Sequence, residues 1–398
     1  MSDQAIDLIN ELRQRVAAID GVAARFDIDG ESVSVGDGEP QAVLSMTRES
    51  LAKLDDGRAA PATLFMTGEL KIEGDMNAAL ALGEALNGDA VGGAVAAAPV
   101  PAASVNPNIA YLDNVGLIVL DLDATRQAFE TLGFNCAERG THFYEKPEGV
   151  FTKWGTANHC VNFRDGGLLE FIAHFYPEHP AGLYGQQLEQ FGNHWGKITV
   201  HCSSSDAEVE RLRRQGHPTA EPAVLYRYTD GEEFRAEPGH SKRTALFSYP
   251  TSFNHGFMTV GAEHSLGEFP ISEAHFQHPN GAQRMPFVLV GCKDLTTTIE
   301  SYEDSLSVAA QDWRGARRIP LGRDTYIVMM AKEQLPEALA EQLGSRSVAC
   351  LGAGFDVSDL DATRSYLESR SMFMEQTPLG WMIAEPIAGS GAIFFNQQ

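Results

Sequence analysis

Apolar positions along the first part of the chain switch between helical and strand-like spacing. Residues 4–19 repeat apolar side chains three and four positions apart, which is the spacing of one face of an amphipathic helix. Shorter apolar runs that predict strands follow, and a second helix is predicted at residues 48–54 with Thr47 as its N-cap. The predicted strands are residues 23–28, 32–35, 42–46 and 64–73, the last broken at Thr67 and Gly68, and a final helix is predicted at residues 75–86. The pattern indicates a small α+β unit.

Residues 89–108 have neither pattern. This stretch is rich in Ala, Val and Pro, carries almost no charge and has no hydrophobic periodicity. Sequences of this composition form semi-extended spacers between folded parts. We therefore predict a linker here, with a domain on either side of it.

The rest of the chain repeats one pattern four times. In each copy a strand-like run is followed by a helix and then by further strand-like runs, and the copies begin at residues 113, 196, 286 and 350. The hexapeptide DLDATR occurs twice, at residues 121–126 and 359–364, and a repeated hexapeptide in a repeated context indicates internal duplication. The repeating unit is predicted to be βαβββ. Its later strands are expected at residues 160–163 and 168–173 in the first copy, and at 381–384 and 392–395 in the fourth.

The first unit resembles the sterol carrier protein type 2 family over most of residues 1–88. The resemblance is strongest in LSMTRESLAKLDDGRAAPATLFMTGELKIEGDMNAALALGEAL, residues 44–86. It implies a twisted sheet covered by helices that enclose an apolar tunnel for a lipid, a sterol or an acyl thioester.

Residues 109–398 resemble the vicinal oxygen chelate superfamily, which includes glyoxalases, bleomycin-resistance proteins and extradiol dioxygenases. The segment WGTANHCVNFRDGGLLEFIA, residues 154–173, is most similar to the glyoxalase-like branch. The resemblance implies that paired modules curl into a cup that holds a metal and a substrate. The expected fold class is therefore α+β. A sterol-carrier-like α/β domain at 1–88 precedes two glyoxalase-like domains built from four βαβββ modules, at 109–283 and 284–398.

Composition narrows the range of partners and compartments. The 398 residues carry 30 basic and 54 acidic side chains, and no Lys or Arg cluster of the kind that binds nucleic acid or anionic lipid surfaces is present. No run of about 18 apolar residues occurs, and the N-terminus has no signal-peptide pattern. Five widely spaced cysteines without a CxxC pair are typical of reduced, buried thiols. We therefore expect a cytoplasmic protein that binds a small molecule.

The histidines point to the first glyoxalase-like domain. All twelve lie between His142 and His278, and none lies in the sterol-carrier-like unit or in the last 120 residues. Neutral imidazole is a common ligand of divalent metals and titrates near neutral pH. A metal-binding or proton-transferring centre is therefore predicted in this part of the chain.

The resemblance also implies where the ligands of such a metal would lie, on the first and last strands of paired modules. Those positions hold Asn114, Lys197, Phe287 and Gly352 on the first strands, and Glu170 and Phe394 on the last strands of the first and fourth modules. Because Phe and Gly side chains cannot bind a metal, the second domain is predicted to be structural, a lid or a dimer surface. In the first domain only the carboxylate is a good ligand, since asparagine is weak and protonated lysine is poor.

Strand alternation provides a replacement set of ligands. Residues two apart face the same side of a strand, so His201 shares a face with Lys197. If residues 271–281 form the last strand of the second module, His275 joins them. We predict that Glu170, Lys197 and His201 are catalytic, and that His201, Glu170 and His275 bind a divalent ion such as Fe(II), Mn(II) or Zn(II). If Lys197 pairs with Glu170, the site would work without metal, with Glu170 as the base.

Two functions remain open from the sequence. In the first, the protein is a lyase, an isomerase or a ring-opening dioxygenase acting on an apolar, oxygen-bearing small molecule, which the sterol-carrier-like domain captures or shields. In the second, it binds or sequesters apolar small molecules or lipids without turnover, which the loss of the usual ligands at Asn114 and Lys197 favours. A homodimer is a further expectation, because the last domain has no predicted site.

Overall fold

The computed structural model describes residues 23–35, 38–55, 64, 69–74, 106–145, 149–179, 182–217, 219, 221–229, 234–236, 240–250, 257–264, 271–383, 387 and 391–398. The predicted helices at residues 4–19 and 75–86 lie outside the described residues, as does the predicted linker except for its last three positions. The chain divides into two compact units, residues 1–98 with 206–222 and residues 99–205 with 223–398. Each unit is described by itself.

The first unit contains a four-stranded sheet. Its strands, in spatial order, are β2 (Glu31–Val35), β1 (Ala24–Ile28), β3 (Ala42–Met46) and β4 (Leu70–Gly74). β1 and β3 alternate between buried and half-buried positions, as expected of strands with one covered face. The N-cap prediction is confirmed, because the Ser50 N–H donates to Thr47 Oγ1 over 3.1 Å. Leu64 is helical, so the first strand predicted in residues 64–73 is wrong at its start. The helix that Thr47 caps is α2 (Arg48–Asp55).

From residue 109 onward the order strand, helix, three strands occurs four times. The first run is β5 (Ile109–Ile118), α5 (Leu122–Thr131), β6 (Gly140–Glu145), β7 (Phe151–Asn162) and β8 (Leu168–His174), and the second is β9 (His194–Cys202), α7 (Ser205–Arg214), β10 (Ala223–Thr229), β11 (Lys242–Ser248) and β12 (Met258–His264). The third is β13 (Ala282–Cys292), α8 (Leu295–Leu306), β14 (Gln311–Trp313), β15 (Ala316–Leu321) and β16 (Thr325–Ala331), and the fourth is β17 (Val348–Val357), α10 (Leu360–Glu368), β18 (Glu375–Thr377), β19 (Gly380–Ile383) and β20 (Ala392–Gln397). Short helices lie between the runs: α6 (Leu183–Phe191), η3 (Glu273–Phe276), η4 (Lys332–Gln334) and α9 (Glu337–Leu343).

The repeated hexapeptide begins a helix in both of its copies. Asp121 accepts a hydrogen bond from the Ala124 N–H, and Asp359 accepts one from the Ala362 N–H, each over 2.9 Å. An aspartate at this position satisfies an N–H group that has no partner within the helix. The third helix begins in the same way, at Asp294.

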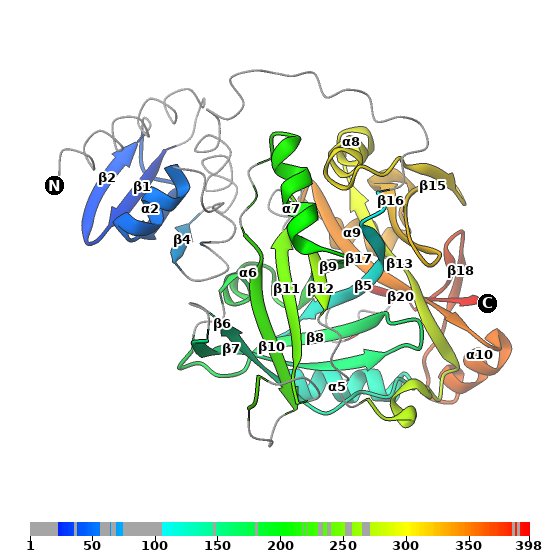
Figure 1. Ribbon diagram of the computed structural model, residues 1–398. Coiled ribbons are helices and arrows are strands. Elements are labelled where there is room, and N and C mark those ends of the chain that lie inside the picture. The colour runs from blue at the N-terminus through cyan, green and yellow to red at the C-terminus, as the bar shows by residue number, and fades with distance from the viewer. Residues whose placement is uncertain are drawn as a thin grey trace. The chain divides into compact units, whose positions relative to one another are not determined.

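The strands of the first two runs close into a ring, which we call the first barrel. Its order is β12-β11-β10-β6-β7-β8-β5-β9, and a parallel pairing of β9 with β12 completes it (Figure 1). Phe171 of β8 packs against Phe129 of α5, with ring centroids 4.4 Å apart. Since neighbouring residues of a strand face opposite sides, Glu170 and Ile172 point to the face opposite α5. We call this the inner face of the first barrel.

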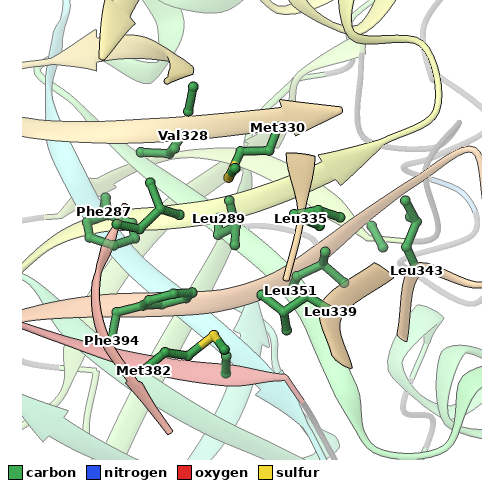
Figure 2. Close-up of a cluster of buried hydrophobic side chains, with 14 residues drawn as sticks. Phe287, Leu289, Val328, Met330, Leu335, Leu339, Leu343, Leu351, Met382 and Phe394 are labelled. Carbon is green, nitrogen blue, oxygen red and sulfur yellow. The ribbon is translucent and has the colours of Figure 1, made fainter. Parts of the chain in front are cut away.

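The strands of the last two runs have the order β18-β19-β20-β17-β13-β16-β15-β14 and continue the same sheet, which we call the second half. Its interior is apolar (Figure 2). Phe287 and Phe394 occupy two of the ligand positions implied by the resemblance; both are buried, and their ring centroids lie 5.8 Å apart. Leu339 and Leu343 of α9 complete this core. Because one sheet runs through both parts, the domain boundary at residue 283 stays a prediction.

Two further features concern membrane-spanning helices and the cysteines. Among the described residues, no helix is long and apolar enough to cross a membrane. All five cysteines are free thiols, and all but Cys136 are buried, which confirms the interpretation of their spacing.

Candidate functional site

A row of polar side chains follows β9 along the inner face of the first barrel. Lys197, Thr199 and His201 alternate with the buried apolar residues Ile198 and Val200. All three polar residues face the same side of the strand. Such a row is costly inside a barrel unless its groups have partners, and for Lys197 and Thr199 the partners come from the neighbouring strands.

The first residue of this row, Lys197, forms an ion pair with Glu170 of β8. Lys197 Nζ donates to Glu170 Oε2 over 2.5 Å, and both side chains are 8% exposed. The second oxygen, Glu170 Oε1, accepts a hydrogen bond from Asn158 Nδ2 of β7 over 2.5 Å. Both carboxylate oxygens are therefore satisfied, which is what a buried carboxylate requires.

The pair is ionised at neutral pH. Burial disfavours the charged form of Glu170, but the positive charge of Lys197 and the hydrogen bonds outweigh it and lower the pKa of Glu170 to about 2. Burial likewise opposes the charge on Lys197, and the Glu170 carboxylate overcomes it and raises the pKa of Lys197. The pair therefore places a fixed positive and a fixed negative charge on the inner face.

Gly116 makes this ion pair possible. It lies on β5, between the two strands that carry the pair, opposite Glu170 on one side and Lys197 on the other. A Cβ at this position would lie 2.9 Å from Lys197 Cβ and 3.1 Å from Lys197 Cε. The stem of Lys197 therefore crosses β5 over the space that a side chain would fill.

We expect Gly116→Ala to lower the free energy of unfolding by about 1–3 kcal/mol, the usual cost of overpacking, because the methyl group displaces Lys197 from Glu170. Gly167→Ala is the matched control, since a Cβ there would meet only an Asp165 carboxylate oxygen at 3.3 Å and the Leu112 carbonyl oxygen at 3.7 Å. Urea unfolding of both variants provides the measurement. Equal small losses in the two variants would contradict the role given to Gly116.

The polar network continues to β6 and β10. His142 Nδ1 lies 2.8 Å from Thr156 Oγ1, and His142 Nε2 lies 3.9 Å from Glu170 Oε1. Burial lowers the pKa of His142 to about 4, even though the Glu170 carboxylate favours its charged form. Its imidazole is therefore neutral at pH 7. Arg227 Nε donates to Asn158 Oδ1 over 2.7 Å, which fixes the orientation of that amide.

A second cluster lies farther along β9, where His201 meets Asp113 of β5 and His264 of β12. One ligand atom from each of these three side chains lies within 4.8 Å of the other two, and Asp113 is fully buried. Asp113 is the extra residue of a β-bulge, because Leu112 pairs with Val200 and Asn114 pairs with Thr199. A bulge redirects a side chain, and here it places the Asp113 carboxylate beside the two imidazoles.

Each member of this cluster, which we call the Asp113 trio, is held differently. Asp113 Oδ1 lies 2.8 Å from His264 Nε2, while His264 Nδ1 lies 2.9 Å from Thr244 Oγ1. Asp113 Oδ2 accepts a hydrogen bond from Asn114 Nδ2 over 2.8 Å. Burial opposes the charge on Asp113, but the neighbouring His264 outweighs it and holds the pKa of Asp113 well below its usual range.

The donor set of the Asp113 trio fits a divalent metal. His201 Nδ1 is buried and has no hydrogen-bond partner among the described residues, so it has a lone pair or a proton without a protein partner. Burial lowers the pKa of His201, which favours the neutral imidazole that metals require. The Thr244 contact to the far nitrogen of His264 is the kind of outer contact that orients a metal-binding imidazole.

The structure brings together some of the predicted site residues and separates others. Glu170 and Lys197 form the pair that was an alternative in the sequence analysis, and Asn114 lies between the two clusters with its Oδ1 accepting from Thr199 Oγ1 over 2.9 Å. His201 belongs to the Asp113 trio, which contains neither Glu170 nor His275. His275 has other neighbours, Ser272 Oγ at 2.9 Å and Glu138 at 3.2 Å.

The strand predicted at residues 271–281 is wrong. This segment contains the short 3-10 helix η3, and the last strand of the second run is β12, Met258–His264. Ser272 starts the short helix, and Pro279 and Asn280 interrupt any longer strand. The misplaced strand selected His275 and passed over His264. Asp113 was missed because strict alternation puts it on the opposite side from Asn114, and a bulge of this kind leaves no clear sequence signal.

Comparisons with known proteins agree with the two-part organisation. A family model for the glyoxalase-like domain matches residues 112–306, and a model for the SCP-2 sterol transfer family matches residues 4–87. No curated protein sequence matches the chain. Solved structures that are similar to this chain share 12–13% of its sequence, a level at which activity is not conserved by default.

A triple mutant of 4-hydroxymandelate synthase from Streptomyces coelicolor has a TM-score of 0.45 and 13% identity, covering 68% of this chain and 78% of its own. A hypothetical protein from Staphylococcus aureus has a TM-score of 0.48 and 12% identity, covering 72% and 99%. A Mn(II)-bound glyoxalase from Novosphingobium aromaticivorans has a TM-score of 0.43 and 12% identity, covering 72% and 82%. On the family matches, the chain is a fusion of an N-terminal SCP-2 sterol transfer region with a glyoxalase-like domain.

Proposed function

We propose that the glyoxalase-like region is a vicinal oxygen chelate-type enzyme that acts on an apolar, oxygen-bearing small molecule with the help of a divalent metal. The observation that carries this proposal is the Asp113 trio, a fully buried carboxylate with two imidazoles in metal-binding distance. Two imidazoles and one carboxylate suit Fe(II), Mn(II) or Zn(II) and leave positions open for a substrate. The match to the glyoxalase-like domain supports an enzyme over a carrier.

The residues of the trio have distinct parts in this proposal. When bound, the metal supplies a Lewis acid that stabilises negative charge on a substrate oxygen. Asp113 provides the charged ligand, because it is ionised at neutral pH. His201 and His264 provide nitrogen ligands, and Thr244 keeps the His264 ring in its orientation.

Glu170 and Lys197 act on the substrate through their charges. A carboxylate whose pKa is about 2 accepts a proton weakly at neutral pH, so Glu170 is poorly suited to act as the base. Its main effect is to keep Lys197 protonated inside the barrel, where an ammonium can donate to a substrate oxygen or stabilise a developing anion. Lys197 and His201 are four residues apart along β9, about 13 Å. Lys197 would therefore contact a part of the substrate remote from the metal.

The surroundings of Lys197 favour an apolar substrate. Ile118 and Ile172 lie on the same part of the sheet, and Leu188 of α6 packs against them, with Tyr184 at the edge of this cluster. The SCP-2 region supports the same substrate class, because proteins of that family transfer sterols. We propose that it captures or delivers the apolar molecule.

A second candidate function is binding without turnover. It is favoured by Asn114 and Lys197, which replace good metal ligands at the positions that the family resemblance implies. In this alternative the Asp113 trio is a buried carboxylate neutralised by its histidines, and the barrel holds an apolar molecule.

Metal analysis separates the two functions. We expect protein purified without a metal-affinity tag to contain close to one equivalent of a divalent transition metal, measured by elemental analysis. Asp113→Ala, His201→Ala and His264→Ala should each abolish it, and His275→Ala, the matched control, should retain it. Protein that has no metal and takes up none, yet still binds apolar ligands, would support the binding function and overturn the enzyme.

A further inference from the structure

The turn between β15 and β16 belongs to the second half of the sheet but lies against the first barrel. It consists of residues 322–325 and is closed by a hydrogen bond from the Thr325 N–H to the Gly322 carbonyl over 3.2 Å. Its central residues, Arg323 and Asp324, have φ values of 55° and 50°. Non-glycine residues are strained in this conformation and keep it only where surrounding contacts hold them, often at functional sites.

The 322–325 turn holds the backbone of β5 next to the bulge. The Leu112 N–H donates to Thr325 Oγ1 over 2.8 Å, and Thr325 Oγ1 in turn donates to the Gly322 carbonyl over 2.7 Å. A Cβ at Gly322 would lie 1.7 Å from the Ala110 carbonyl oxygen, so the two backbones are in direct contact. Leu112 immediately precedes Asp113, and the bulge that directs the carboxylate is therefore fixed from the second half.

The same turn begins a stack of side chains that ends at the Asp113 trio. The Arg323 guanidinium lies 4.0 Å from the centroid of the Tyr111 ring. Tyr111 stacks on His201 with centroids 4.7 Å apart and an interplanar angle of 21°, and His201 stacks on His264 at 5.4 Å and 29°. Arg323 is itself anchored by a hydrogen bond to the Asp165 carbonyl.

The orientation of His201 depends on this stack. Among the described residues no hydrogen bond to its imidazole is present, and its Nδ1 is buried. The neighbouring rings are therefore the contacts that set the plane of the His201 ring. A cation over an aromatic face is attracted by the ring quadrupole, so Arg323 holds Tyr111 in place and Tyr111 holds His201.

We infer that Arg323 and Thr325 are positioning residues for the Asp113 trio, and that the apolar second half supports the site of the first barrel. Thr325 fixes the bulge that directs Asp113, and Arg323 fixes the ring that orients His201. The effect on metal binding rests on the proposed function, whereas the orientation of His201 does not. The two are therefore measured separately.

The test compares Arg323→Gly with Asp324→Gly. Both variants replace a strained central residue of one turn by glycine, which adopts that conformation freely, so both should fold with equal or slightly higher thermal stability. Only the first removes the guanidinium from Tyr111. The probes are Co2+ affinity, followed by visible absorption, and the imidazole resonances of His201 in metal-free protein labelled with 15N-histidine.

We expect Arg323→Gly to weaken Co2+ binding about tenfold, the lower end of the effect of losing an outer contact of a metal ligand, and to shift the His201 resonances. Asp324→Gly should change neither, and Arg323→Lys should restore most of the affinity. The inference is overturned if Arg323→Gly and Asp324→Gly behave alike in both measurements. If the unmodified protein binds no Co2+ but Arg323→Gly still shifts His201, the metal proposal fails and the positioning role stands.

Discussion

Replacing Glu170 by leucine is expected to lower the free energy of unfolding at pH 7 by about 3–5 kcal/mol. The change leaves the Lys197 ammonium, which is 8% exposed, without its counter-charge inside the first barrel. Removing one partner of a buried pair is far more damaging than removing both, because the remaining charge is uncompensated. Chemical denaturation followed by circular dichroism gives the measurement.

Two control variants make this prediction specific. In Glu170→Leu/Lys197→Met both charges are gone, so most of the lost stability should return. Glu130→Gln breaks the Arg126–Glu130 pair, whose side chains are each 40% exposed, and exposed pairs contribute less than about 1 kcal/mol. If Glu170→Leu lowers the free energy of unfolding no more than Glu130→Gln does, the Lys197 ammonium does not need the Glu170 carboxylate for the barrel to be stable.

The Glu170–Lys197 pair also makes the stability of the protein depend on pH in the acidic range. The pKa of Glu170 falls from its ordinary value of 4.5 to about 2 on folding. Its stabilisation is therefore complete above about pH 4.5 and is lost as the pH falls from there toward 2. The Glu170→Leu/Lys197→Met variant should lose this part of the acid sensitivity, which unfolding measurements between pH 2 and pH 5 would detect. If the stability of this variant depends on pH in the same way as that of the unmodified protein, the acid sensitivity does not come from Glu170.

Replacing Asp113 by asparagine is expected to weaken divalent metal binding by more than about 100-fold, the upper end of what loss of an outer contact costs. Asparagine keeps the shape of the side chain and can still bond to His264, but it removes the charge and the best oxygen ligand. Titration with Co2+ or Zn2+ measures the loss.

Glu263→Gln is the matched control for Asp113→Asn. It makes the same carboxylate-to-amide change one residue from His264, on a side chain that instead accepts hydrogen bonds from the Ser205 N–H and hydroxyl. Its metal affinity should equal that of the unmodified protein. An Asp113→Asn variant that binds metal as tightly as Glu263→Gln would remove Asp113 from the site.

Much of the fold follows from local sequence features. The repeated DLDATR begins two helices with the same aspartate cap. Phe287 and Phe394, which cannot bind a metal, predict a second half without a metal site at their positions, and the structure buries both in its apolar core. The Glu170–Lys197 pair also follows in part, since a carboxylate inside an apolar strand needs a partner and alternation puts Lys197 on an inward face. These features depend on neighbouring residues or on a strict period of two.

The Asp113 trio depends on features that a single sequence does not reveal. Asp113 reaches the inner face because a β-bulge breaks the period of two. No residue in Leu112–Val115 marks the bulge in the sequence. His264 was passed over because the last strand of the second run was placed at 271–281, where the structure has a short helix. The contribution of Arg323 comes from a turn more than 200 residues away from Tyr111, and a contact at that separation is visible only in the folded chain.

The two halves of the large unit illustrate how one architecture can serve two purposes. On β9 the alternate positions carry Lys197, Thr199 and His201, whereas the corresponding interior of the second half is filled by phenylalanine, leucine and methionine. A close-packed interior of this kind is rigid. Such rigidity suits the second half to support the Asp113 trio through the 322–325 turn.

The most direct test of this account is an anomalous-diffraction map of crystals grown with Mn(II) or Zn(II), recorded on both sides of the metal absorption edge. We expect one strong peak within bonding distance, about 2.0–2.2 Å, of the side chains of Asp113, His201 and His264. A map without a peak there, or with its peak beside Glu170 or His275, would contradict it.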